Sequence, residues 1–218
     1  MFNYLFPLLL ESSTNKKALK IGVVLVLVNQ LSGCFALINY TAEIFMESGS
    51  SLSPNMSAIV VGIIQLAGSC ISTVVVDRVP RKILYFLSCV GTMFGLIAFG
   101  LHGYLKLSLN VSMFNWVPIA SLSFVIFIAS IGLLPLTFIM LSEVLPQQIR
   151  SFGVSFCTAI LWFLAFLLLR FFSTIVALLQ LYLCMWIFSG FVFFGMIFVI
   201  FFVPETKNKS MEEIEKAL

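Results

Sequence analysis

The chain has 218 residues, of which 61% are hydrophobic and only 10% are charged, and its formal net charge is +3. Soluble domains are roughly half apolar and about a quarter charged, so this composition leaves too little polar surface for a solvated protein. A net charge this small also gives no electrostatic footprint for nucleic acid. We therefore expect an integral membrane protein whose partner is the lipid bilayer, with no nucleic-acid partner.

Residues 1–10 are apolar, but they lack the basic start and the small-residue cleavage site of a signal peptide. They are also too few to cross a bilayer. We expect an interfacial helix there, or a piece of a preceding cytoplasmic loop.

Six later stretches each supply the roughly 20 apolar residues that a membrane-spanning helix needs, and their continuous apolar character excludes the alternating pattern of a β-barrel. The predicted fold class is an all-α membrane protein with six transmembrane helices in residues 21–203. A cytoplasmic segment at 1–20 precedes this bundle, and a cytoplasmic tail with a short helix at 204–218 follows it. The predicted spans are Ile21–Tyr40, Met56–Val76, Ile83–Tyr104, Val117–Leu141, Phe152–Phe172 and a last one inside Ile175–Val203.

Basic residues orient these spans, because short loops rich in Lys and Arg stay on the cytoplasmic side. The turn Asp77–Lys82 is the most strongly charged of the connections. Only Lys106 and Arg170 lie on the opposite side from the other basic residues, so both termini are predicted to be cytoplasmic. The residues on the cytoplasmic side are Lys16, Lys17, Lys20, Arg78, Arg81, Lys82, Arg150, Lys207, Lys209 and Lys216.

Two local signals shape the helices. The stretch Gly132–Pro135 makes the fourth span the most prone to bend or break, although close helix packing is the other reading of glycines in spans. The stretch Ser210–Glu213 has capping-box spacing, so Ser210 is predicted to begin a short helix. Ile214 belongs to the apolar face of that helix, which we expect to lie under the bundle.

No enzyme motif is present: the sequence contains no G-x-S-x-G, P-loop or H-E-x-x-H, and its single histidine is His102. The five cysteines lie in five different apolar runs, which indicates small buried residues rather than a disulfide framework. We therefore expect no enzyme, no cofactor and no metal site.

Amides inside the spans are the first candidates for function. Asn29, Gln30 and Gln65 each need a partner in hydrocarbon, which is either another helix or a ligand. Both readings stay open for Gln65. The adjacent pair Asn29-Gln30, placed just before Gly33, favours a hydroxyl-rich ligand.

Charges at the cytoplasmic ends of the second and fourth spans are the second candidates. An ion-pair cluster between the two loops biases a two-state equilibrium if it forms in one conformation and breaks in the other. The alternative is that these charges only set the topology. They are Asp77, Arg78, Arg81, Glu143 and Arg150, with Glu205 and Glu213 of the tail near the same surface.

Four motifs follow one another along the chain. Asn29–Gly33 reads N-Q-L-S-G, Asp77–Lys82 reads D-R-V-P-R-K, Ser142–Pro146 with Arg150 reads S-E-V-L-P…R, and Pro204–Glu215 reads P-E-T-K-N-K-S-M-E-E-I-E. They resemble the Q-Q-L-S-G, D-R-x-G-R-K, E-x-x-P…R and P-E-T-K-G-x-S-x-E-E-I-E motifs of the sugar porter family of the major facilitator superfamily. Within that family the chain resembles the C-terminal half of the insect facilitated trehalose and glucose-type transporters, from about Lys16 to its end.

Sugar porters have twelve helices in two halves around a central site, so the resemblance implies a half-bundle of helices seven to twelve, built as two three-helix inverted repeats. It implies facilitative transport of trehalose or a hexose across the plasma membrane by alternating access. The substrate-binding residues that it implies are Asn29, Gln30, Gln65 and Trp162. The gate charges that it implies are Asp77, Arg78, Arg81, Glu143, Arg150, Glu205 and Glu213.

Several positions depart from the family pattern. Phe35, Phe138 and Leu161 stand where the family has amide or indole groups, and Pro80 and Asn208 replace glycines. Each lost hydrogen bond weakens binding by about 0.5–1.5 kcal/mol, so we expect a weak or lost sugar site. The alternative hypothesis is a truncated or degenerate half-porter that does not transport and at most forms a homodimer or associates with a full-length porter.

Overall fold

The computed structural model describes residues 13–48, 54–108 and 116–217. Over these residues the chain is helical, without strands, and six helical segments are long and apolar enough to cross a membrane. These segments are Thr14–Asn39, Ala58–Val75, Arg81–Lys106, Val117–Val144, Arg150–Leu179 and Leu181–Phe202. The predicted all-α bundle with six spans is confirmed, whereas the interfacial stretch expected at residues 1–10 lies outside the described residues.

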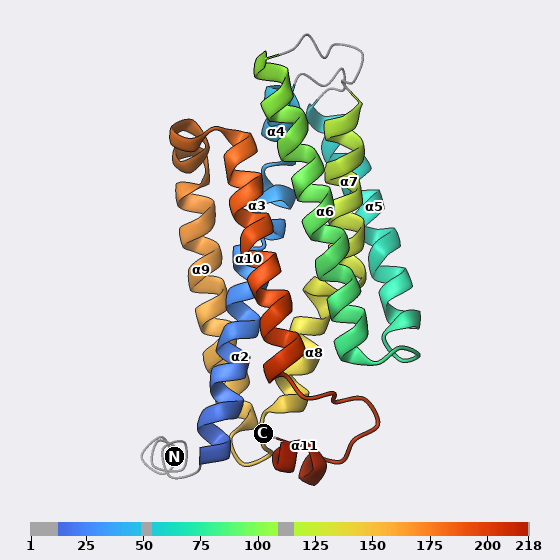
Figure 1. The fold of residues 1–218 in the computed structure, drawn as a ribbon, viewed down its shortest axis with the longest axis vertical. Helices are drawn as coiled ribbons and strands as arrows, with labels where there is room; N and C mark the ends of the chain where they lie inside the picture. The colour runs from blue at the N-terminus through green and yellow to red at the C-terminus, as the bar shows by residue number, and fades with distance from the viewer. Residues whose placement is uncertain (1–12, 49–53, 109–115, 218) are drawn as a thin grey trace.

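The first span is a broken helix (Figure 1). α2 (Ser13–Leu31) is followed by α3 (Cys34–Asn39) and α4 (Thr41–Ser48), and Gly33 between α2 and α3 has a φ of 74°, in the left-handed region. The break also needs glycine for space, because a Cβ at Gly33 would clash with the ring of Phe188.

The fourth span breaks where the sequence predicted. α5 (Pro54–Val75) and α6 (Arg81–Ser108) are the second and third spans, and the fourth consists of α7 (Val117–Ile131) and α8 (Leu133–Val144) on either side of Gly132. A Cβ at Gly132 would lie 2.5 Å from the Cβ of Ser88 on α6. Gly132 is therefore both the site of the break and a point of close packing between helices.

One predicted boundary is wrong. The fifth span is predicted to end at Phe172, but α9 (Arg150–Leu179) continues to Leu179 and the chain turns at Gln180. The last span, α10 (Leu181–Phe202), begins directly afterwards and lies inside the predicted range Ile175–Val203. Residues 171–179, across the predicted end, contain no Gly, Pro or charge that would stop a helix. The tail then ends in α11 (Met211–Ala217).

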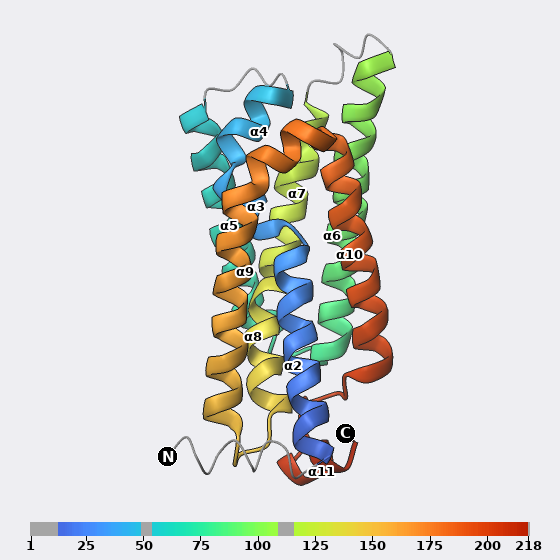
Figure 2. The ribbon, with the colours of Figure 1, turned by 90° about the vertical axis from the view of Figure 1, so that its left-hand side faces the viewer.

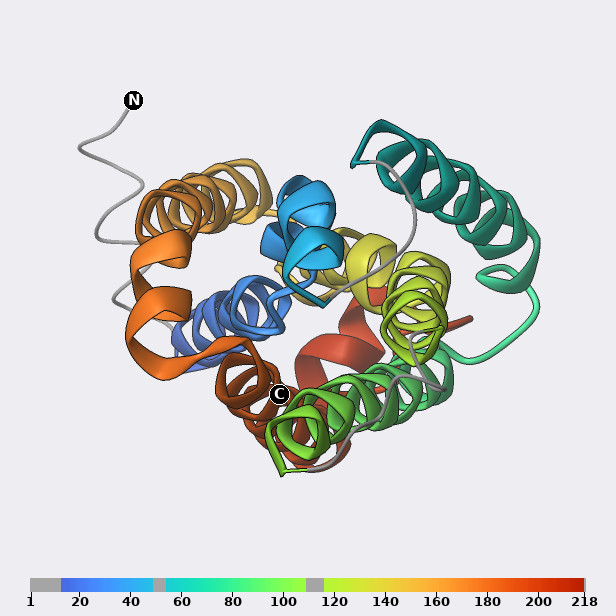
Figure 3. The same ribbon diagram turned by 90° about the horizontal axis from the view of Figure 1, so that it is seen from above.

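The helices form one bundle in which α6 packs against α7 and α10, and α2 packs against α8, α9 and α10 (Figure 3). α5 packs against α7. The start of α2 and the helix α11 lie at the same end of the bundle (Figures 1 and 2), as do the turn between α5 and α6 and the end of α8. The start of α2, the basic turn between α5 and α6, the end of α8 and the tail therefore lie at one end.

Two spans are poorly covered by the rest of the bundle. In α5 and α9, 17% and 22% of the most apolar window is buried, against 67% in the first span. On α9 the aromatic side chains Trp162, Phe163 and Phe166 are each more than half exposed. Figure 3 shows α5 and α9 on the same side of the bundle, on either side of α3 and α4. The bundle itself leaves this apolar side uncovered.

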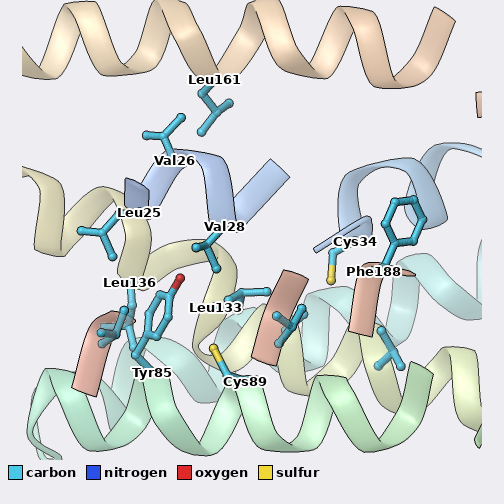
Figure 4. Packing of buried hydrophobic residues seen from close by; sticks show 14 of the residues in the cluster. Leu25, Val26, Val28, Cys34, Tyr85, Cys89, Leu133, Leu136, Leu161 and Phe188 are labelled. Atoms are coloured by element: carbon cyan, nitrogen blue, oxygen red, sulfur yellow. The ribbon is translucent and has the colours of Figure 1, made fainter. Parts of the chain in front are cut away.

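The core lies between α2, α6, α8 and α10. Leu25, Tyr85, Leu133 and Leu136 are fully buried and converge there (Figure 4). Four of the five cysteines are buried and all five are free, so the predicted absence of a disulfide framework is confirmed. Cys70 is the exception to the expected burial, because it lies on the exposed surface of α5.

Candidate functional site

A buried amide joins α2 to α8. The side-chain nitrogen of Asn29 donates to the Thr137 hydroxyl at 3.0 Å and to the carbonyl oxygen of Leu133 at 3.3 Å. The Thr137 hydroxyl in turn donates to the same carbonyl at 2.8 Å. Asn29 is 4% exposed, so its amide nitrogen is occupied in holding the first turn of α8 against α2. Of the two roles open to it, the contact between helices is the one observed.

Ser88 on α6 bridges the break in the fourth span. Its hydroxyl accepts the backbone N–H of Leu133 at 2.8 Å and donates to the carbonyl oxygen of Ile128 at 2.8 Å. One side chain thus satisfies the N–H of Leu133 at the start of α8 and links it to the carbonyl oxygen of Ile128, which also accepts the backbone N–H of Gly132 at 3.3 Å. Sequence reasoning missed Ser88, since a single serine in an apolar run carries no signal of a partner on another helix.

Gln30 differs from its neighbour. It is 2% exposed, and its side-chain nitrogen has no hydrogen-bond partner among the described residues. A buried donor without a partner costs about 1–3 kcal/mol, which makes a hydroxyl group of a ligand a favourable partner.

Gln65 lines a cleft between α5 and α8. The cleft has a volume of about 620 Å³, and its walls include Gln65, Ser69, Thr73, Asp77, Ser130 and Phe138. We call it the α5–α8 cleft. Gln30 and Trp162 are not among its lining residues. This cleft therefore does not combine Gln65 with the other predicted substrate-binding residues.

Trp162 lies on the exposed surface of α9, where its ring meets Phe35 edge to face with centroids 5.9 Å apart. It is 56% exposed. The ring of Phe35 therefore packs against Trp162, the predicted substrate-binding indole, on the uncovered side of the bundle.

Charged residues meet at the end of the bundle that carries α11. Arg81, at the start of α6, has its Nε 3.6 Å from Glu143 Oε1 and its Nη2 3.8 Å from Asp77 Oδ1. The Arg81 guanidinium also donates to the carbonyl oxygen of Val76. The Arg81 side chain is 13% exposed and that of Glu143 is 29% exposed, whereas Asp77 is 82% exposed. The pair between Arg81 and Glu143 is thus the shielded one, and it links α6 to the end of α8.

The tail completes this arrangement. The Glu205 carboxylate accepts the backbone N–H groups of Arg81 at 3.0 Å and Lys82 at 3.1 Å, which are the first residues of α6. The Thr206 hydroxyl donates to Glu143 Oε2 at 2.5 Å. The first contact is electrostatically favourable, because a helix N-terminus attracts a carboxylate. We call Asp77, Arg81, Glu143, Glu205 and Thr206 the charge cluster.

The remaining predicted gate residues make other contacts. Arg150 Nε donates to the carbonyl oxygen of Leu145 at 3.3 Å, and Arg78 is exposed. Glu213 accepts the backbone N–H of Ser210 at 2.9 Å, while its own N–H donates to the Ser210 hydroxyl at 3.3 Å. This reciprocal pair confirms the predicted capping box. Ile214 is buried, as expected for the apolar face of α11.

Thr206 is the member of the charge cluster that sequence reasoning missed. It stands within the P-E-T-K motif, but a hydroxyl carries no signal that singles out Glu143 as its partner. Across the described ranges, no group of three or more His, Cys, Asp or Glu residues could hold a metal ion.

Comparison with known proteins places these features in a family. The family model described as "Sugar (and other) transporter" matches residues 4–218. The facilitated trehalose transporter Tret1 of Bombyx mori is 38% identical over 202 residues, covering 92% of this chain and 40% of that protein. The protein of the same name from Polypedilum vanderplanki is 39% identical over 219 residues, covering 99% of this chain and 43% of that protein.

Solved structures agree on the fold. The inward-open xylose transporter XylE from E. coli superposes with a TM-score of 0.79 at 24% identity, over 95% of this chain and 43% of that one. The bundle therefore shares its fold with the part of that structure that it covers. The chain is an integral membrane protein that belongs to the sugar transporter family. It spans between 23% and 43% of the length of the curated relatives reported for it, which are named as transporters and not as enzymes.

Proposed function

We propose that this chain is the C-terminal half of a facilitative sugar transporter that moves trehalose or a hexose by alternating access. The observation that carries the proposal is the charge cluster, in which three motifs typical of sugar porters meet at one end of the bundle. Arg81 comes from the turn motif, Glu143 from the end of α8, and Glu205 with Thr206 from the tail. The trehalose-transporter relatives support the class of substrate.

In this proposal the substrate lies against the uncovered apolar side of the bundle, the side on which α5 and α9 lie. Gln30 offers a buried amide donor, Gln65 an amide in the α5–α8 cleft, and Trp162 an exposed aromatic face. Asn29 contributes mainly by holding α8 in place, because its nitrogen bonds to Thr137. The other half of the transporter completes the site from the opposite side.

The charge cluster acts in this proposal as the cytoplasmic gate. Both termini are cytoplasmic and the membrane is the plasma membrane. The positive-inside rule supports this orientation, since the basic turn before α6 and the basic tail share one end of the bundle. The pairs of Arg81 hold that end together in one conformation, and they separate when the end opens.

The alternative function is a half-porter that does not transport and at most associates with a second copy or with a full-length porter. The rings at Phe35 and Phe138 favour it, because they remove hydrogen-bonding groups from the sugar site. An extensive uncovered apolar side on α9 suits either reading, since it fits another transporter half.

A hybrid transporter tests the proposal. We define the hybrid as the upstream half of the Bombyx mori relative joined in front of this chain. In liposomes it should take up labelled trehalose in a saturable way, and Gln65→Ala should lower uptake several-fold. The matched control is Gln147→Ala, an exposed amide outside the cleft, which should leave uptake unchanged. Equal effects of both variants would remove Gln65 from the substrate site.

A further inference from the structure

A separate cavity lies at the end of the bundle opposite α11. Figures 1 and 2 show α4 and the turn between α9 and α10 at that end, and residues of both line the cavity, among them Glu43, Ile44, Phe172, Ser173 and Gln180. We call it the α4–α9 cavity. Its volume of about 190 Å³ is below the range of about 300–1,000 Å³ that is typical of drug-sized ligands, so it suits a small chemical group.

The length of α9 places this cavity at the level of the lipid headgroups. α9 has 30 residues, which extend about 45 Å at about 1.5 Å per residue. The hydrocarbon core of a bilayer is only about 30 Å thick, whereas the bilayer with its headgroups measures about 40–45 Å. The last turn of α9 and Gln180 therefore lie among the headgroups of the leaflet opposite the charge cluster. This conclusion follows from helix length, so it holds for either orientation of the chain.

The polar residues of the lining favour a cation. Glu43, Ser173 and Gln180 carry a carboxylate, a hydroxyl and an amide oxygen, which all accept hydrogen bonds. Glu43 has no ion-pair partner among the described residues, and no basic side chain lines the cavity. A primary ammonium group has three N–H donors. These donors match the three acceptors of the cavity.

The aromatic content of the lining does not suit a quaternary ammonium group. Such groups are bound in cages of several aromatic rings, whereas Phe172 is the single aromatic residue that lines this cavity. Its ring already packs against Tyr40, with centroids 4.8 Å apart, and Phe172 is 3% exposed. A primary ammonium is therefore favoured over a trimethylammonium.

Arg170 lies one turn nearer the middle of the bilayer. It precedes Ser173 by three residues and Ala177 by seven, so it lies on the side of α9 that carries both of these lining residues. Arg170 is exposed and forms no ion pair with any residue that the structure describes. Long arginine side chains extend from a span toward the interface, and guanidinium groups bind phosphate. From the membrane interior outward, the order is thus guanidinium and then carboxylate, which matches the order of phosphate and ammonium in a lipid headgroup.

We propose that the α4–α9 cavity binds the headgroup of an ethanolamine phospholipid. The ammonium group lies among Glu43, Ser173 and Gln180, and the phosphate lies at Arg170. The bound headgroup connects α4 to the end of α9. It therefore stabilises the packing of α4, which the interruption at Tyr40 separates from the rest of the first span.

Lipid titration followed by native mass spectrometry tests this site. The 218-residue chain is purified in detergent and titrated with phospholipids that share acyl chains and phosphate. They differ only in the methylation of the amine, from ethanolamine to choline. We expect the ethanolamine lipid to bind about fivefold or more tightly than the choline lipid, because only its ammonium donates charge-assisted hydrogen bonds. Equal affinities along the series would overturn the proposal, and this comparison needs no variant.

Variants of the two charged residues separate the two contacts. Glu43→Gln should lower the affinity for the ethanolamine lipid to that for the choline lipid. Arg170→Gln should weaken both lipids alike, since both carry the phosphate. The matched control is Glu212→Gln, which removes an exposed carboxylate of α11 at the other end of the bundle and should change neither affinity. Equal losses in Glu43→Gln and Glu212→Gln would overturn the proposal, because the effect would then come from overall charge.

Free ethanolamine distinguishes a lipid from a soluble amine. In large molar excess it should displace little of the bound lipid, because it lacks the phosphate and the acyl chains. Complete displacement would make the cavity a site for soluble amines and would overturn the assignment to a lipid. Transport plays no part in these readouts, so their outcome is independent of the proposed function.

Discussion

Glu143→Gln should open the end of the bundle that carries the charge cluster. The substitution keeps the shape of the side chain and an oxygen that accepts the Thr206 hydroxyl, but it removes the charge that faces Arg81 at 3.6 Å. The conformation in which these groups meet is therefore destabilised relative to the one in which they are apart.

The magnitude follows from distance and burial. Two charges about 3.6 Å apart interact by roughly 4–5 kcal/mol at an effective dielectric constant of about 20, before the cost of desolvation. Fully exposed pairs retain only about 0–1 kcal/mol. Arg81 is 13% exposed and Glu143 is 29% exposed, so we expect a net effect of about 1–2 kcal/mol. Since about 1.4 kcal/mol is a factor of ten, the open population should rise about 5- to 30-fold.

The assay is labelling of Phe138→Cys, a half-exposed position in the α5–α8 cleft, in the hybrid with Cys70→Ser. In inside-out vesicles, Glu143→Gln should raise its labelling rate several-fold. Asp77→Asn is the matched control, because Asp77 is 82% exposed and lies 3.8 Å from Arg81, and its effect should stay below about twofold. If both variants raised the labelling rate equally, the ion pair between Arg81 and Glu143 would not be what keeps this end of the bundle closed. Unchanged labelling with loss of trehalose binding would instead place Glu143 in the substrate site.

Three further results are expected. Ser88→Ala should lower the free energy of unfolding in SDS titration by about 1–3 kcal/mol, because the buried N–H of Leu133 loses its acceptor; Ser142→Ala, whose hydroxyl bonds within its own helix, should cost far less, and equal losses would contradict the bridging role. Gln180→Gly should raise the same free energy by about 1 kcal/mol, since φ 68° and ψ 151° belong to a region open essentially to glycine; a loss of stability would show that the Gln180 side chain contributes more than the strain costs. Protease added outside sealed right-side-out vesicles should cut neither terminus, and glycan should attach at Asn55 or Asn110 and not at Asn208; cleavage at one terminus would remove the basis of the orientation.

Local sequence signals predicted the parts of the structure that depend on neighbouring residues. The break at Gly132 and the capping box at Ser210 and Glu213 follow from spacing within a few residues, and both are observed. The end of α9 could not be predicted in this way, because residues 171–179 contain no Gly, Pro or charge that would mark the end of a helix.

Contacts between distant segments were beyond the reach of the sequence. Ser88 and Leu133 are 45 residues apart, and Thr206 and Glu143 are 63 apart, so nothing in either segment indicates its partner. The amide of Asn29 illustrates the same limit. A polar group in a span predicts that a partner exists, but only the folded bundle identifies it as Thr137 rather than a ligand.

Uptake of labelled trehalose by liposomes tests most directly the claim that this chain is one half of a two-half transporter. The 218-residue chain and the hybrid are reconstituted in parallel at equal amounts of protein. Alternating access needs two halves that rock around a shared site, so the chain alone should show no saturable uptake, whereas the hybrid should show uptake that excess unlabelled trehalose abolishes. Saturable, competable uptake by the chain alone, without a crosslinked dimer, would contradict the account.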